Sequence, residues 1–354
     1  MADAPRDSTG IDLGRIGRRV ALFALVAIAA VVALAMLPGI GEVRDRLARA
    51  EPGWIVVSAV CSLGSSLGFV VALWGVFDRV PPRGSAVSLG FAEQGANVLL
   101  PAGGSSGPAF GTFVMRRAGV PGDLAADRHV ALFLITSGVS LAALVVFGVL
   151  LATHVLPGEE SLAWTLLPAA AGAAGIGLAL LFARTRVPVE PPGEQRVRHG
   201  FWRLRSFLHH GVRTSIAELR HGDVLLPIGA VAYYGFDVAA LGASFEAFGG
   251  GGPPLGVFVL AYTLGHAGAL IPTPGGVGGT DGGLIGMFAL MDTPLPLATA
   301  AVLGYRVFQL GIPVVLGAIS LLRIRGRLAD DAFREGVRLR WAEVAERSAH
   351  RADA

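Results

Sequence analysis

Several ionisable side chains lie within apolar stretches of the sequence, where an uncompensated charge is costly. Arg306 and Asp237 each fall inside an apolar run, and Asp281 closely follows a segment rich in glycine and proline. Arginine suits a phosphate group because its planar fork donates to two oxygens at once. We therefore expect Arg306 to pair with Asp281, to bind the phosphate of a lipid head group, or to do both if the phosphate competes with the carboxylate. Asp237 is a candidate for substrate contact for the same reason.

A second group of polar residues surrounds another break in the apolar pattern. Glu93, Gln94 and Asn97 recur at helical spacing on a short apolar stretch. They are candidates for contact with a substrate, or they satisfy backbone groups that the break leaves open. Arg128 is a candidate partner of Glu93 or Asp127, or it snorkels from a helix end.

Two segments combine apolar residues with helix breakers, and these must position the charged groups. The stronger is 269–281, Ala-Leu-Ile-Pro-Thr-Pro-Gly-Gly-Val-Gly-Gly-Thr-Asp, and the weaker is 97–107. Proline removes a backbone donor, glycine permits unusual backbone angles, and in hydrocarbon a broken backbone persists only where protein or a water-filled cavity satisfies it. We expect a substrate site at these breaks, with a kinked, tightly packed helix pair as the alternative. The candidate lining residues are Pro101, Gly103, Gly104, Gly107, Pro272, Pro274, Gly275, Gly276 and Gly278.

The composition is that of an integral membrane protein. Of 354 residues, 53% are hydrophobic and 16% are charged, and the mean hydropathy is +0.61, whereas a soluble domain carries about 25% charged residues. The apolar runs reach about 20 residues, the length of a membrane-spanning helix, so we predict an all-α polytopic protein. The single cysteine, Cys61, excludes an intramolecular disulfide and a cysteine metal cluster. No nucleotide-binding loop is visible, and we expect no cofactor, no metal and no nucleic-acid partner.

We predict about six full transmembrane helices plus two broken or re-entrant helical hairpins. The full spans are expected at 20–37, 53–77, 130–151, 162–182, 224–248 and 297–322, and the hairpins at 85–114 and 255–291. The first span is interpreted as retained rather than as a signal peptide. The expected domains are an N-terminal segment at 1–19, a transmembrane domain at 20–322 and a charged, solvated helical tail at 323–354. Within the transmembrane domain, 184–223 form a basic amphipathic segment that lies on an anionic lipid surface or packs on the spans.

Arginine gathers on one side of these spans, which sets their orientation. The positive-inside rule places both termini in the cytoplasm, and the two hairpins then enter from opposite faces. Each break is followed by a short apolar half-helix, a proline-containing turn and an arginine, Arg128 after the first and Arg306 after the second. Two broken segments at corresponding positions mark an inverted-repeat transporter, whose substrate site lies near the midplane where half-helix N-termini supply positive dipole ends.

The motifs around the breaks resemble those of a known family. Leu-Pro-x-Gly-Gly at 100–104 precedes Arg-Arg-x-Gly-Val-Pro at 116–121, and Ile-Pro-Thr-Pro-Gly-Gly-Val-Gly at 271–278 precedes Gly-Tyr-Arg at 304–306 and Ile-Pro-Val-Val-Leu-Gly at 312–317. Over roughly 53–325 the chain resembles the flippase-like transmembrane domain of the lysylphosphatidylglycerol synthases (multiple peptide resistance factor). The resemblance implies a stand-alone lipid-translocating domain without the aminoacyl-transferase domain, and it adds Tyr305 to the candidate site.

Two departures from the family pattern bear on the substrate. Asp281 stands where the family commonly has glutamate, and the sequence Gly104-Ser-Ser-Gly107 replaces a Gly-Glu pair followed by arginine. We expect a cell-membrane protein, not an enzyme, that moves a phospholipid, aminoacylated or otherwise, or a polyprenyl-linked head group between leaflets. A homodimer is one admissible assembly.

Two other classes of function are retained as alternatives. The sequence at 104–107 matches the Gly-x-Ser-Gly pattern of rhomboid intramembrane proteases, with Ser106 as nucleophile and His266 as base. His266 is otherwise a neutral core histidine, or a proton relay together with Asp237. The third class is a non-transporting membrane scaffold that recruits an enzyme through its basic segment.

Overall fold

The computed structural model describes residues 41–100, 105–158, 161–185, 196–271 and 273–352, and in these ranges the regular structure is entirely helical. Five of the described helices are long and apolar enough to cross a membrane. They are α3 (Pro52–Val76), α6 (Gly122–Ala152), α7 (Leu162–Ala183), α9 (Leu225–Ala247) and α12 (Leu295–Leu328). They confirm five of the predicted spans, and the predicted span at 20–37 lies outside the described residues. The chain is a polytopic all-α membrane protein.

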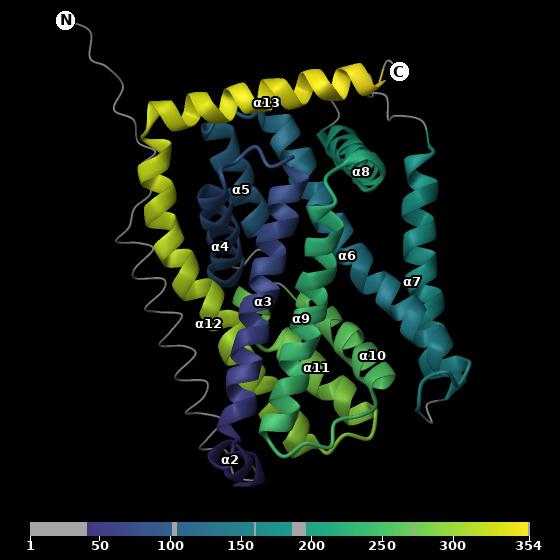
Figure 1. Ribbon diagram of the computed structural model, residues 1–354. Helices are drawn as coiled ribbons and strands as arrows, with labels where there is room; N and C mark the ends of the chain where they lie inside the picture. The colour runs from purple at the N-terminus through teal and green to yellow at the C-terminus, as the bar shows by residue number, and fades with distance from the viewer. Residues whose placement is uncertain (1–40, 101–104, 159–160, 186–195, 272, 353–354) are drawn as a thin grey trace, which may run out of the picture.

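Helices α3 and α9 form a closely packed pair at the centre of the molecule (Figure 1). A Cβ atom added at Gly75 would lie 2.5 Å from the Leu226 nitrogen, and one at Gly229 would lie 2.3 Å from the Ala72 nitrogen. The Ser58 hydroxyl also donates to a backbone carbonyl across the pair at 2.9 Å. Small residues and interhelical hydrogen bonds are what hold helices together in lipid, where burial alone gives little driving force. This pair fixes α9, which carries Asp237.

The first broken segment is a hairpin of α4 (Arg83–Leu99) and α5 (Ser106–Arg117). Its two outer ends lie on one side of the molecule, next to α13 (Asp331–Ala352), which we call the α13 face (Figure 1). At the start of α4, the Ser85 hydroxyl accepts from Arg327 at 2.8 Å, and after α5 a Cβ atom at Gly119 would lie 3.3 Å from the Arg338 Cβ atom. At 1.5 Å per residue neither helix alone crosses about 30 Å of hydrocarbon, so the predicted broken hairpin is observed.

The second broken segment enters from the opposite face. It consists of α10 (Leu255–Gly265), the 3₁₀ turns η1 (His266–Leu270) and η2 (Pro274–Gly276), and α11 (Gly279–Leu290). Its legs touch so closely that a Cβ atom at Gly268 would lie 2.0 Å from the Gly279 carbonyl oxygen. Between them, Gly275, Gly276 and Gly278 have positive φ angles of 61°, 69° and 85°, which glycine adopts without strain. The glycine-rich motif is therefore the turn of the hairpin.

Three further helices lie outside these elements. They are α2 (Gly41–Ala48), α8 (Arg196–His221) and α13. Helix α8 packs against α6 and α7, where the His209 side chain is buried and its Nε2 lies 2.9 Å from the Thr185 carbonyl oxygen. This bears out packing on the spans, one of the two interpretations of the basic segment.

Helix α13 corrects the prediction of a solvated tail. It lies across the ends of the other helices (Figure 1) and buries Val337, Trp341 and Val344 on one side. Its charged residues occupy the remaining surface, where Arg338 pairs with Glu335. Alternating charge along the sequence concealed these apolar positions, which recur at helical spacing.

Candidate functional site

The turn of the second hairpin meets the end of α4, the first leg of the other hairpin. The turn η2 packs against α4, and a Cβ atom at Gly275 would lie 3.4 Å from the Val98 Cγ1 atom and 3.2 Å from the Leu310 Cδ2 atom. The expected convergence of the two breaks is therefore observed at their described residues. Of the predicted lining residues, Pro274, Gly275, Gly276 and Gly278 lie in or beside η2. Gly107 is buried in the first turn of α5, and Pro101, Gly103, Gly104 and Pro272 lie outside the described residues.

Arg306 ties α12 to the second hairpin. Its Nε donates to Asp281 at 2.6 Å, its Nη1 to the Gln309 side chain at 2.6 Å and its Nη2 to the Gly275 carbonyl at 2.5 Å. The second oxygen of Asp281 accepts from the Gly278 N–H at 2.8 Å, so the carboxylate also caps α11. The predicted pairing with Asp281 is confirmed. Three of the five guanidinium N–H groups make these bonds, and the side chain is only 6% exposed.

Asp237 is held by two phenols. The Tyr262 hydroxyl donates to its Oδ2 at 2.5 Å, and the Tyr305 hydroxyl donates to the same oxygen at 2.7 Å. All three side chains are buried. Hydrogen bonds to an ionised acceptor are the strong ones, so the two phenols compensate the negative charge without removing it. Tyr305 and Arg306, adjacent in the sequence, thus hold Asp237 and Asp281 respectively.

A polar cavity of about 180 Å³, the central cavity, lies beside these groups. Its lining residues are Thr136, Ser140, Tyr233, Tyr234, Asp237, Tyr262, Thr263, His266 and Gln309. They come from α6, α9, α10, η1 and α12, so the cavity depends on the fold and not on one motif. Gln309 connects it to Arg306.

Several lining residues of the central cavity were not predicted from the sequence. Gln309 lies three residues after Arg306 and Tyr262 four residues before His266. Side chains at these spacings share one face of a helix. Only this helical spacing from Arg306 and His266 could have indicated Gln309 and Tyr262 as lining residues.

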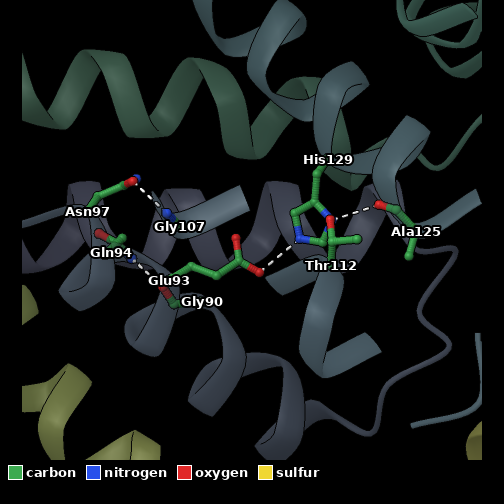
Figure 2. A network of polar contacts seen from close by, with 8 residues as sticks. All are labelled: Gly90, Glu93, Gln94, Asn97, Gly107, Thr112, Ala125 and His129. Carbon is green, nitrogen blue, oxygen red and sulfur yellow. Dashed lines mark hydrogen bonds and ion pairs between the residues drawn. The ribbon is translucent and has the colours of Figure 1, made fainter. Parts of the chain in front are cut away.

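Glu93 belongs to a separate buried network in the first hairpin (Figure 2). Its Oε1 lies 2.9 Å from His129 Nε2, and both side chains are at most 1% exposed. The other imidazole nitrogen, Nδ1, lies 2.7 Å from the Ala125 carbonyl oxygen and 3.2 Å from the Thr112 hydroxyl. Since a carbonyl only accepts, Nδ1 carries a hydrogen, and the Glu93–His129 pair shares one further proton. Arg128, predicted as a candidate partner of Glu93, does not face it, because His129 fills this position.

Of the neighbouring polar residues, Asn97 satisfies backbone at the break, whereas Gln94 bonds to carbonyls inside α3 and α4. Asn97 Oδ1 accepts from the Gly107 N–H at 2.6 Å, joining α4 to the start of α5 (Figure 2). Gln94 donates to the carbonyls of Ser66 and Gly90, both at 3.2 Å. None of these residues lines the central cavity. The structural role that was the alternative for this group is thus the one observed.

Arg128 lies near the start of α6, at the α13 face. It pairs with Asp78 at 2.9 Å and with Glu218 at 2.6 Å, and its guanidinium stacks 5.7 Å from the centre of the Trp341 ring. It also donates to the Val76 carbonyl at 2.7 Å. Arg128 therefore joins four elements of the α13 face and is not the counterpart of Arg306 that the internal repeat predicts.

The Arg128 cluster makes stability depend on pH. Burial raises the pKa of Glu218 to about 7, against the opposing effect of Arg128 and with a further rise from Asp78. An unfolded glutamate has a pKa of about 4.3, so between these values only the folded protein binds the proton, and stability falls as pH rises through 7. We expect the unfolding temperature of the wild type in detergent to fall between pH 5 and pH 8. In Glu218→Gln the fall should be smaller. Glu335→Gln, on the surface of α13, should keep the wild-type pH slope, and an unchanged slope in Glu218→Gln would contradict the prediction.

The geometry does not favour the protease alternative. The Ser106 hydroxyl donates to the Leu100 carbonyl at 3.4 Å, within the first hairpin. His266 Nδ1 lies 3.0 Å from the Tyr262 carbonyl, within the second. No hydrogen bond joins these two described side chains, and a nucleophile needs its base within hydrogen-bond reach.

Comparison with known proteins places the chain in a family. No protein with a curated description matches it. One family model, described as the lysylphosphatidylglycerol synthase TM region, matches residues 21–317. The match contains both broken hairpins, the Arg306–Asp281 pair and every residue that lines the central cavity. The chain therefore belongs to the family of lysylphosphatidylglycerol synthase transmembrane regions.

Proposed function

We propose that the protein moves the head group of an amine-bearing phospholipid between the leaflets of the cell membrane, through the central cavity. The observation that carries this proposal is a partly open polar cavity, with Asp237 and Tyr262 buried in its wall, beside two half-length hairpins that enter from opposite faces. Broken helices at membrane depth are tolerated where they line such a cavity, and in transporters they form the substrate site. Membership of the family supports a lipid-related, flippase-like role.

The charges of the site favour a head group that carries both an amine and a phosphate. Asp237 and the rings of Tyr233 and Tyr262 line the central cavity, and an ammonium group is stabilised by a carboxylate and by aromatic faces. Arg306, connected through Gln309, is the partner for the phosphate. An aminoacylated or ethanolamine-type phospholipid offers both groups. A polyprenyl-linked saccharide offers a phosphate to Arg306 but no cation to Asp237.

The size of the central cavity implies a conformational step. Its 180 Å³ is below the range of about 300–1,000 Å³ typical of sites for drug-sized ligands. A head group therefore enters only as the hairpins separate. In this proposal the lipid phosphate takes the place of Asp281 at the guanidinium, which loosens the hold of α12 on α11.

Flipping measured in proteoliposomes tests the proposal. The probe is aminoacylated phosphatidylglycerol, and the readout is the access of its amine to a membrane-impermeant reagent. We expect Asp237→Asn, which keeps the shape but loses the charge, to slow flipping by at least about tenfold, a loss of about 1.4 kcal/mol in the barrier. Asp45→Asn, on the exposed surface of α2, is the matched control and should flip at the wild-type rate. Equal rates in Asp237→Asn and wild type, or no flipping by the wild type, would overturn the proposal.

A further inference from the structure

A second cavity lies at the α13 face, far along α4 and α12 from the hairpin turns. It has a volume of about 510 Å³. Its lining residues are Gly84, Ser88, Leu322, Arg323, Gly326 and Arg327. It shares no residue with the central cavity. It lies where the end of α12 approaches the start of α4, below α13 in Figure 1.

The chemistry of this cavity is basic. Arg323 and Arg327 are four residues apart on α12, so their side chains share one face of the helix. Among the ion pairs of the described residues, none involves either arginine. Arg327 is oriented by its donation to the Ser85 hydroxyl at 2.8 Å. Gly84 lies in the first turn of α4, where free N–H groups and the helix dipole add positive potential.

Small residues leave the space open. Gly326 has no atom within 4 Å of an added Cβ position, and at Gly84 the only such atom is the Arg327 Nη2 at 3.4 Å. Leu322, which is 57% exposed, provides an apolar wall next to the two guanidinium groups. The cavity thus combines two cations with an apolar border.

The length of α12 places this cavity at the level of lipid head groups. The helix has 34 residues, and about 20 residues span the hydrocarbon at 1.5 Å per residue. Since α12 begins at Leu295 on the opposite face, its last two turns stand beyond the hydrocarbon on the α13 face. Arginines at this depth meet phosphates rather than acyl chains.

We propose that this cavity binds the phosphodiester of an anionic lipid in the leaflet at the α13 face, as a resident lipid distinct from the head group that passes through the central cavity. The phosphate lies between Arg323 and Arg327 at the start of α4, and the glycerol and first acyl carbons lie against Leu322. The net negative charge of the lipid is what the site recognises. Free phosphate offers the same group without the apolar part.

Lipid binding to the full-length protein, measured by native mass spectrometry after delipidation, tests this site. We expect the Arg323→Gln/Arg327→Gln double variant to bind phosphatidylglycerol at least about tenfold more weakly than the wild type, since each arginine near anionic lipid contributes a comparable factor. Arg325→Gln removes an exposed arginine of the same helix that does not line the cavity, and it should bind as the wild type does. Arg323→Gln alone should show a smaller loss of lipid binding with an unchanged unfolding temperature, because Arg323 makes no ion pair or side-chain hydrogen bond with any residue that the structure describes.

Two further ligands, tested in the same experiment, distinguish a lipid phosphate from a free phosphate. Phosphatidylethanolamine should bind more weakly than phosphatidylglycerol, and millimolar inorganic phosphate should leave the bound lipid in place. Displacement by inorganic phosphate would identify a free-phosphate site and overturn the lipid assignment. An equal loss in Arg325→Gln, or no loss in the double variant, would show general attraction to a basic helix end and overturn the site. Flipping activity does not enter these measurements, so the central cavity is judged separately.

Discussion

Replacing Arg306 by alanine is expected to destabilise the protein by about 3–5 kcal/mol, because the change leaves the Asp281 carboxylate, only 17% exposed, without its cation. The substitution also removes the hydrogen bonds to Gln309 and to the Gly275 carbonyl, so the hairpin turn loses its link to α12. Thermal unfolding in detergent micelles measures the effect. Arg325→Ala, at an exposed position of the same helix, should change the unfolding temperature little. Equal stability of the two variants would show that Arg306 does not hold the hairpin.

Two companion variants separate the charge from the geometry of the fork. In Arg306→Ala/Asp281→Ala no charge is left unpaired, so the double variant should be more stable than Arg306→Ala alone. Together with Asp281→Ala, the two variants complete a double-mutant cycle that measures the coupling of the pair. Arg306→Lys keeps the positive charge but loses bidentate donation. It should therefore be more stable than Arg306→Ala. If the guanidinium binds the phosphate as we propose, it should nevertheless flip lipid more slowly than the wild type does.

Gly111→Ala is expected to cost at least about 1–3 kcal/mol, the range for overpacking a tight core. An added Cβ atom would lie 1.9 Å from Glu93 Oε1 and 2.3 Å from His129 Nε2, so either α5 shifts or the buried pair separates. The stability should fall even though alanine favours a helix over glycine by up to about 1 kcal/mol. Unfolding temperature in detergent is the measurement.

Gly138→Ala on α6 is the matched control for this substitution. Nothing lies within 4 Å of its added Cβ atom, so only the helix preference remains and the variant should be as stable as the wild type or more stable. If Gly111→Ala behaved in the same way, the packing of α5 over the Glu93–His129 pair would be wrong.

The spans and the two breaks were predictable from the sequence because their causes are local. An apolar run of sufficient length must form a helix in lipid, which located α3, α6, α7, α9 and α12. The Pro-Gly sequence at 272–279 cannot continue a helix, and the positive φ angles of its glycines show why. Arg306 and Asp281 were predictable as partners because a lone charge at depth needs one.

Partners that depend on tertiary packing were not predictable. Glu93 meets His129 only because α5 carries a glycine at position 111, which lets α4 and α6 approach. Arg128 was assigned to the membrane interior by its place in the repeat, yet the pairing of α6 with α8 and α13 draws it to Glu218. The tyrosines around Asp237 come from α10 and α12, so no single stretch of sequence contains that cluster.

The meeting of two half-length hairpins has an electrical consequence. On the proposed route a head group crosses the membrane at this junction, and the transmembrane voltage then acts on any net charge that the head group carries. An elementary charge that crosses the full voltage gains or loses about 2.3 kcal/mol per 100 mV. A lipid head group with a net positive charge would therefore be driven through the junction toward the negative side, whereas a zwitterionic head group would distribute without regard to voltage.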